Sequence, residues 1–141
     1  MRAPKKQKRK SGIPCGNAGE YFVMGELLRH GYDAQLADRN TKGYDMLVGK
    51  ADQKTLRKVQ VKSSRTKSWF VRQASIDRKA PNQVTVYVLV GTINGNTPVR
   101  FFIAKNRGLR INRPPSKWRT YTTVSIKQLA QFENRWGTVL K

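Results

Sequence analysis

The chain has 141 residues, of which 38% are hydrophobic and 26% charged, so its length and composition fit a globular protein with one compact core. Its 29 Lys and Arg outnumber 8 Asp and Glu and give a net charge of +21, a field that concentrates polyanions around the protein. A single cysteine and a single histidine exclude an internal disulfide and a zinc-ligand cluster, which leaves carboxylates as the groups for any chemistry.

The excess of positive charge predicts a nucleic-acid partner, with DNA as the first choice and RNA as the alternative. Two other interpretations of the charge are a ribosome-associated or solubilising surface and attraction to an anionic membrane. No run approaches the roughly 18 consecutive apolar residues that span a bilayer, and no apolar stretch follows the basic N-terminus as in a secretory signal. We therefore expect a cytoplasmic protein that does not bind membranes and for which nucleoid association would fit.

Residues 1–12 are rich in lysine and arginine and contain no acid, which predicts a disordered basic arm ahead of one domain over residues 13–141. Such an arm can lie along nucleic-acid phosphates, or it can be a solvated tail. The rest of the chain stays strongly basic without it, so the arm would add affinity to a body that is already positive.

The first regular element predicted is a helix over residues 17–30. Asn17 is placed to cap its start and Gly31 to end it, with a glutamate three residues after the cap. The helical period places on one face Glu20, Tyr21, Met24, Leu27 and Leu28.

Extended segments follow this helix. Three of them, joined by polar turns, predict an antiparallel meander, and two longer apolar segments around an Asn-Gly-Asn turn predict a central hairpin. The basic stretch over residues 64–82 lacks clean periodicity and predicts a long loop with a short helical piece. A second helix is expected over residues 125–136, whereas residues 105–124 predict no clear element. The strands are expected over residues 33–37, 44–49, 56–63, 84–91 and 99–104.

The segment over residues 56–63 alternates, so that Val59 and Val61 fall on one face and Gln60 and Lys62 on the other. One face would pack in the core, and the other would carry chemistry. Asp45 lies in the neighbouring apolar segment, so it can meet the Gln-x-Lys pattern at the strand ends. A partly buried carboxylate there is costly unless a cation or a hydrogen-bond donor compensates it.

These residue types suit hydrolysis of a phosphodiester with a magnesium or manganese ion. A hard cation prefers oxygen ligands, which Asp45, the Gln60 side chain and the Val61 carbonyl can supply. Lys62 can orient or deprotonate the attacking water and offset charge on the phosphate. Glu20 can complete the site from the first helix, although a glutamate near a helix start is also favoured for capping alone.

The order and spacing of Glu20 on a helix, Gly-Tyr-Asp at residues 43–45 and Gln-Val-Lys at residues 60–62 resemble the PD-(D/E)XK nuclease superfamily, particularly its small archaeal Holliday-junction-resolvase-like members. The resemblance is clear over residues 16–63. It implies a restriction-endonuclease-like α/β fold with an αβββαβ core, in which helices flank a central mixed sheet.

Position by position, the resemblance implies that Asp45 is the metal ligand, Lys62 the catalytic lysine and Glu20 the carboxylate from the helix. Gln60 departs from the usual Asp or Glu and brings one less negative charge to the metal, which weakens metal binding. Tyr44 stands where the motif has proline, a position that makes no metal bond.

Basic residues around the proposed site are candidates for contacts with phosphates on either side of the cleaved bond. Trp69 and Phe70 can stack on bases, although aromatic residues in a loop more often anchor it to the core. No recognition helix or zinc finger is indicated, so we expect specificity for shape, such as a branch or a single strand. The candidate nucleic-acid contacts are Arg39, Lys42, Arg65, Lys67, Trp69, Arg72, Arg78 and Lys79.

The sequence leaves three functions open. The first is a metal-dependent endonuclease that acts on branched or junction DNA, for which a homodimer is expected because two strands need two sites. The second is a catalytically inactive DNA- or RNA-binding module of the same fold, in which Gln60 marks lost metal affinity. The third is a ribosome-associated basic protein.

Overall fold

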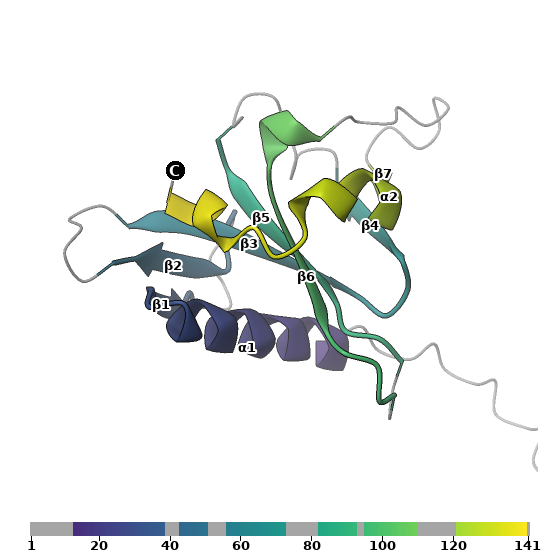
Figure 1. Cartoon of the computed structure of the whole chain (residues 1–141), viewed down its shortest axis with the longest axis horizontal. Coiled ribbons are helices and arrows are strands. Elements are labelled where there is room, and N and C mark those ends of the chain that lie inside the picture. Colours follow the sequence, from purple (N-terminus) through teal and green to yellow (C-terminus); the bar gives the residue numbers. More distant parts are fainter. Residues whose placement is uncertain are drawn as a thin grey trace, which may run out of the picture.

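The computed structural model describes residues 13–38, 43–50, 56–72, 82–92, 95–109 and 121–140. The basic arm expected over residues 1–12 lies outside them. In the described part of the chain, a mixed sheet lies between an N-terminal helix and a smaller layer of two strands and short helical turns (Figure 1). None of the described helices is long and apolar enough to cross a membrane.

The central sheet has five strands in the order β1-β2-β3-β5-β6. β1 (Asp33–Leu36), β2 (Met46–Gly49) and β3 (Arg57–Ser64) form the predicted antiparallel meander. β5 (Val84–Leu89) runs parallel to β3 and pairs with β6 (Arg100–Lys105) in the predicted hairpin. The parallel pairing of β3 with β5 makes the sheet mixed, as the fold prediction required, and β6 forms an edge rather than the centre.

Helix α1 (Ile13–Arg29) covers one face of the sheet and starts before the predicted cap. Pro14 suits the first turn, because backbone nitrogens there have no acceptor within the helix and proline has no N–H to leave unpaired. Asn17 therefore lies inside the helix, and its assignment as the cap is wrong. The end of the helix agrees with the prediction, since Gly31 adopts a φ of 83°, which glycine accepts without strain.

The face of α1 that packs on the sheet differs in part from the predicted one. Leu27 is fully buried as expected, but Tyr21 and Leu28 leave 63% and 53% of their surface exposed. Gly19 explains the choice of face, because any Cβ at this position would collide with the side chain of Ser63 in β3. The turn of α1 that carries Gly19 can therefore approach the sheet closely.

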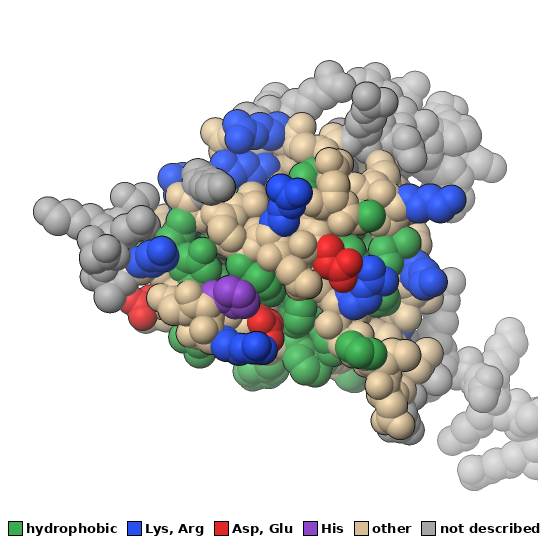
Figure 2. Space-filling model, in the orientation of Figure 1, with side chains coloured by type: hydrophobic (Ala, Val, Ile, Leu, Met, Phe, Trp, Pro, Cys, Tyr) green, Lys and Arg blue, Asp and Glu red, His purple; other side chains and the backbone are tan. Residues whose placement is uncertain are grey.

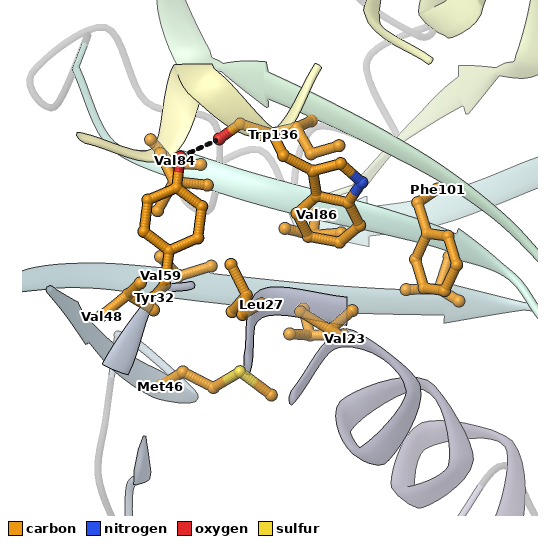
Figure 3. Close-up of a cluster of buried hydrophobic side chains, with 14 residues drawn as sticks. Val23, Leu27, Tyr32, Met46, Val48, Val59, Val84, Val86, Phe101 and Trp136 are labelled. Atoms are coloured by element: carbon orange, nitrogen blue, oxygen red, sulfur yellow. Dashed lines mark hydrogen bonds between the residues drawn. The ribbon is translucent and has the colours of Figure 1, made fainter. Parts of the chain in front are cut away.

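The main hydrophobic core lies between α1 and the sheet, and alternate residues of β3 and β5, such as Val59 and Val86, point into it (Figure 3). Trp136, from the C-terminal segment, packs in the same core, with its ring 5.3 Å from that of Phe101. The Tyr32 hydroxyl donates a hydrogen bond of 3.3 Å to the Trp136 carbonyl oxygen. A long-range polar contact thus fixes the C-terminal segment to the end of α1.

The opposite face of the sheet is covered by β4 (Ser68–Arg72) and β7 (Tyr121–Ser125), which pair antiparallel. The predicted loop over residues 64–82 is therefore wrong where β4 forms, and residues 73–81 lie outside the described residues. Trp69 packs edge to face against two rings of the central sheet, those of Tyr87 and Phe102, at 5.8 and 5.9 Å. This contact anchors β4 to the sheet.

The C-terminal helix is shorter than predicted. α2 (Ile126–Leu129) starts with a capping box, in which the Ser125 side chain accepts a hydrogen bond from the Gln128 nitrogen and the Gln128 side chain accepts one from the Ser125 nitrogen. Asn134 adopts a φ of 57°, a left-handed conformation that cannot continue a right-handed helix. The other short helices are the 3-10 turns η2 (Asn106–Gly108), η4 (Ala130–Phe132) and η5 (Trp136–Leu140).

Candidate active site

Asp45 links the two motifs that the sequence singled out. β2 and β3 pair up to Met46 and Val59, and the Asp45 nitrogen donates to the Val59 carbonyl oxygen at 2.9 Å. Two residues further along β3, the Val61 N–H donates a hydrogen bond of 2.8 Å to the Asp45 carboxylate. The side chain of Asp45 thus takes the place of a strand partner where β2 and β3 separate, and the Asp meets the Gln-x-Lys segment as expected.

The Val61 carbonyl faces the same gap. In a β-strand the N–H and the C=O of one residue point to the same edge, and the Val61 N–H points to Asp45. A carboxylate oxygen and a backbone carbonyl oxygen therefore border one opening between the two strands. These are two of the oxygen groups that the sequence analysis named as candidate metal ligands.

Gln60 and Lys62 lie on the face of β3 opposite to the main core, as the alternation predicted. Val59 and Val61 are buried against α1, whereas Gln60 and Lys62 are half-buried. Gln60 Oε1 is buried and has no hydrogen-bond partner within the described part of the chain. A buried oxygen without a partner costs about 1–3 kcal/mol, so this atom is available to an incoming ligand.

A hard divalent cation fits this donor set. Gln60 Oε1, the Asp45 carboxylate and the Val61 carbonyl are all oxygen donors of the kind that magnesium prefers. Within the described residues there is no group of three or more His, Cys, Asp or Glu side chains that could hold a metal. The charge offered to a cation at this point comes from Asp45.

Lys62 is held through its backbone. The indole nitrogen of Trp69 donates a hydrogen bond of 3.1 Å to the Lys62 carbonyl oxygen. Trp69 itself is 1% exposed, so its predicted role in stacking on bases is wrong, and it anchors β4 beneath β3 instead. Trp69 thus has the alternative role that the sequence analysis named, which is to anchor its segment to the core.

Glu20 lies in the middle of α1 and is half-buried. Because the helix starts at Ile13, Glu20 is not in the first turn, and the capping explanation for it does not apply. The preceding residue, Gly19, packs on Ser63 of β3, which follows Lys62 in the chain. Glu20 therefore lies on the α1 side of β3, whereas Gln60 and Lys62 lie on the other side.

Two polar residues at this site were missed by the sequence analysis. Thr85 and Tyr87 of β5 pair in register with Gln60 and Lys62, and their hydroxyls are buried, with no hydrogen-bond partner other than each other in the described residues. Burial raises the pKa of the Tyr87 phenol, which keeps it protonated as a hydrogen-bond donor. Their alternation with valine in the Val84–Leu89 strand was the available signal, but the run was interpreted as uniformly apolar.

The predicted phosphate-binding residues fall in different places. Arg65 is half-buried at the end of β3, and Lys67 and Arg72 are exposed at the two ends of β4. Phe70 is 64% exposed and stays a candidate for stacking. Blue Lys and Arg side chains are spread over the face seen in Figure 2. Outside the described residues lie Arg39, Lys42, Arg78 and Lys79.

Cys15 and His30 are far apart. Cys15 is in the first turn of α1 and His30 follows its last turn, which places them roughly 22 Å apart at about 1.5 Å per residue. The His30 ring lies 5.4 Å from that of Trp136, and its Nδ1 is 2.8 Å from the Glu26 carbonyl oxygen. This separation excludes nucleophilic catalysis by a Cys15–His30 pair.

No protein-family model matches the sequence, and no curated protein matches it with significant similarity. Solved structures with a similar fold include Hjc, a Holliday junction resolvase from the archaeal hyperthermophile Archaeoglobus fulgidus, with a TM-score of 0.57 and 13% identity over 87% of this chain and 94% of that one. They also include the bacterial homing endonuclease I-Ssp6803I, with a TM-score of 0.54 and 15% identity over 92% of each chain. The predicted fold, restriction-endonuclease-like with a mixed sheet between helices, is thus confirmed.

Proposed function

We propose that this chain, which has a restriction-endonuclease-like fold, is a metal-dependent endonuclease that hydrolyses phosphodiester bonds of DNA with branched or junction structure. The observation that carries the proposal is the 2.8 Å hydrogen bond from the Val61 nitrogen to the Asp45 carboxylate, beside the unpartnered Gln60 Oε1. Asp45 and Val61 border the opening between β2 and β3, Gln60 precedes Val61 and Lys62 follows it, which supports a metal site at this point.

Asp45, Gln60 and the Val61 carbonyl are proposed to hold Mg²⁺ or Mn²⁺. Glu20, the further ligand expected from the sequence, lies on the α1 side of β3 and is left out of this proposed set. When bound, the ion supplies positive charge that stabilises the phosphate in the transition state and lowers the pKa of a bound water. The hydrogen bond from Val61 fixes the orientation of the Asp45 carboxylate, so that the other carboxylate oxygen stays available for the ion.

Lys62 is proposed to act on the water and on the phosphate. Its ammonium group can orient the attacking water by hydrogen bonds and offset negative charge on the phosphoryl oxygens. The hydrogen bond from Trp69 to the Lys62 carbonyl holds the backbone of this residue and limits how far the side chain can shift.

DNA is supported as the substrate by the fold and by the charge. The two similar structures are those of a Holliday junction resolvase and a homing endonuclease. The net charge of +21 attracts a polyanion, and neither the sequence nor the described elements indicate a recognition helix. We therefore propose recognition of DNA shape rather than of base sequence.

Two chains are proposed to pair, because cutting two strands requires two sites. The outer side of α1 carries exposed apolar side chains, with Tyr21 at 63%, Phe22 at 45% and Leu28 at 53% exposure. Green side chains gather over α1 in Figure 2. Sedimentation of the wild type should show a dimer, and the double substitution of Phe22→Asp with Leu28→Asp should give a monomer; a dimer that persists would remove this surface from the proposal.

A nucleic-acid-binding module without catalysis is the second candidate function. It is favoured by Gln60, which brings no charge to a metal, and by the lack of a cluster of three His, Cys, Asp or Glu side chains within the described residues. Such a module would bind DNA or RNA with the same salt dependence but would not cut. Co-sedimentation with ribosomes after lysis at low salt would instead favour a ribosome-associated protein.

The test is cleavage of labelled duplex, single-stranded, branched and RNA substrates with Mg²⁺ or Mn²⁺. Wild type is compared with Lys62→Ala and with Lys127→Ala, which removes an exposed lysine from α2 and serves as the matched control. We expect cutting of branched DNA that requires the metal and Lys62 but not Lys127. Salt-sensitive binding without cutting by the wild type would contradict the nuclease and favour the binding module.

A further inference from the structure

A hollow of about 480 Å³ lies beside the candidate active site. Its volume falls within the range of about 300–1,000 Å³ that is typical of sites for small ligands. It is lined by an aromatic ring, a leucine, two cations, two amides and a glycine. These residues are Gly43, Tyr44, Leu56, Arg57, Lys58, Asn82 and Gln83.

The hollow and the active site share one face of β3. Lys58, Gln60 and Lys62 alternate with core residues, so all three lie on the same side of the strand. At about 3.3 Å per residue, Lys58 is about 6.6 Å along the strand from Gln60 and about 13 Å from Lys62. Tyr44 directly precedes Asp45. The hollow therefore lies about one nucleotide away from the proposed point of cleavage.

The walls of the hollow are formed before any ligand binds. The Gln83 side chain donates a hydrogen bond of 3.0 Å to the Gly43 carbonyl oxygen, which joins the start of β5 to the residue before Tyr44. Lys58 Nζ lies 5.0 Å from the centre of the Tyr44 ring, a cation–π contact that keeps an ammonium group at the mouth. Little ordering is then left for the moment of binding, which favours affinity.

We infer that this hollow binds one unpaired nucleotide next to the phosphate that is cut. Its base stacks on Tyr44, and its phosphate is bound by Arg57 and Lys58. The position of the cut rests on the proposed function, whereas binding of the nucleotide does not. Bases in a continuous duplex are stacked and paired, and extracting one costs energy that an already unpaired base does not require. The substrate class is thus narrowed to DNA with an unpaired nucleotide at a branch, a flap or a strand end.

The experiment measures binding of the full-length protein without divalent metal, so that no cutting occurs. The probes are two DNA duplexes of equal length, one of which carries a single unpaired 2-aminopurine nucleotide, whose fluorescence falls when it stacks on a ring. We expect quenching and tighter binding with the unpaired probe. Tyr44→Ala should abolish the quenching and weaken binding of this probe by about 5- to 150-fold, the usual effect of losing a base–aromatic stack.

Three further variants keep the result interpretable. Tyr44→Phe keeps the ring that lines the hollow and should behave as the wild type. Lys58→Ala should weaken binding of the unpaired probe more than Lys67→Ala does, since only Lys58 lines the hollow. If Tyr44→Ala folds, as judged by thermal unfolding, and binds both probes as the wild type does, the inference is overturned.

Failure of this inference and failure of the proposed function give different results. Quenching that depends on Tyr44 in a protein that cuts no substrate would support the nucleotide site and contradict the nuclease. Metal-dependent cutting of a continuous duplex as fast as of a branched one, with no effect of Tyr44→Ala on either, would contradict the nucleotide site and leave the nuclease standing.

Discussion

The two faces of β3 differ in chemistry: one carries apolar side chains, and the other carries polar side chains beside buried polar groups of β5. On the α1 side, Val59 and Val61 are 0% and 8% exposed and pack in a continuous apolar core. On the other side, Gln60 and Lys62 are half-buried and pair in register with Thr85 and Tyr87. In the described part of the chain, the buried Gln60 Oε1 has no hydrogen-bond partner, and the buried hydroxyls of Thr85 and Tyr87 have none other than each other.

This difference separates stability from function within one strand. Burial of apolar surface contributes about 25 cal/mol per Å², so the α1 side stabilises the fold. On the other side, each unpartnered buried polar group opposes folding by about 1–3 kcal/mol, which offsets part of the stabilisation from the second core around Trp69, Tyr87 and Phe102. Local costs of this kind are expected where a protein binds a ligand, and the core on the first face offsets them.

The largest effect is expected from Asp45→Asn. The amide oxygen can still accept the Val61 N–H, so we expect the melting temperature to change by only a few degrees. Loss of the charge should lower metal-dependent cleavage by about 1,000-fold or more, which corresponds to about 4 kcal/mol. Single-turnover cleavage and thermal unfolding measure the two effects. Cleavage that survives in a folded variant would show that Asp45 is not the metal ligand.

Leu27→Ala tests the first face alone. Leu27 is fully buried between α1 and the sheet, so the lost contacts and the cavity should cost about 2–5 kcal/mol. Urea unfolding measures this loss. Cleavage per folded molecule at low temperature should stay unchanged, because the side chain lies on the far side of β3 from Gln60. A specific loss of activity in the folded fraction would show that the faces are coupled.

Gln60→Glu probes the charge of the site. Without metal, the buried carboxylate should lower the melting temperature, since a charge without a partner is costly to bury. With Mg²⁺ we expect about tenfold tighter metal binding than in the wild type, and therefore a larger rise in melting temperature on adding the ion. A rise no larger than in the wild type would contradict a metal site at Gln60.

Tyr87→Phe removes one buried hydroxyl from the second face. Because the buried hydroxyl has no partner other than the Thr85 hydroxyl, we expect the stability of the variant to differ from that of the wild type by less than about 1 kcal/mol, in contrast to Leu27→Ala. Denaturant unfolding measures this difference. A loss of stability above 1 kcal/mol would mean that the hydroxyl is compensated in the folded protein and that the contrast between the faces is weaker than described.

The smallest effect on stability is expected from the ion pair between Arg100 of β6 and Glu133, which lies between η4 and η5. Arg100 binds Glu133 through two hydrogen bonds of 2.8 and 2.9 Å, which lower the pKa of Glu133. Both side chains are about a third or more exposed, so Glu133→Gln should cost less than about 1 kcal/mol at pH 7. The stabilisation is present above the unfolded pKa of about 4.3 and is lost as the pH falls through the lower folded value. The free energies of unfolding of wild type and variant should therefore differ at pH 7 and converge at pH 3. An equal difference at both pH values would contradict this role of the ion pair.

Much of the central sheet could be predicted from the sequence. The apolar segments gave β1, β2, β3, β5 and β6 to within a few residues, because alternation and turn residues act locally. The placement of Val59 and Val61 opposite Gln60 and Lys62 follows from the same two-residue period. Asp45 and the Gln-x-Lys segment could be paired because they lie on strands that are neighbours in sequence.

What the tertiary structure alone decided rests on contacts between distant residues. β4 forms because Ser68–Arg72 finds Tyr121–Ser125 as its partner, far away in the chain, and Trp69 is buried by rings from β5 and β6. The buried hydroxyls of Thr85 and Tyr87 and the hollow beside Tyr44 likewise exist only once β3 and β5 lie parallel. Local patterns determined which residues form strands and which faces they present, whereas the partner of each face depends on packing across the whole chain, which no local period encodes.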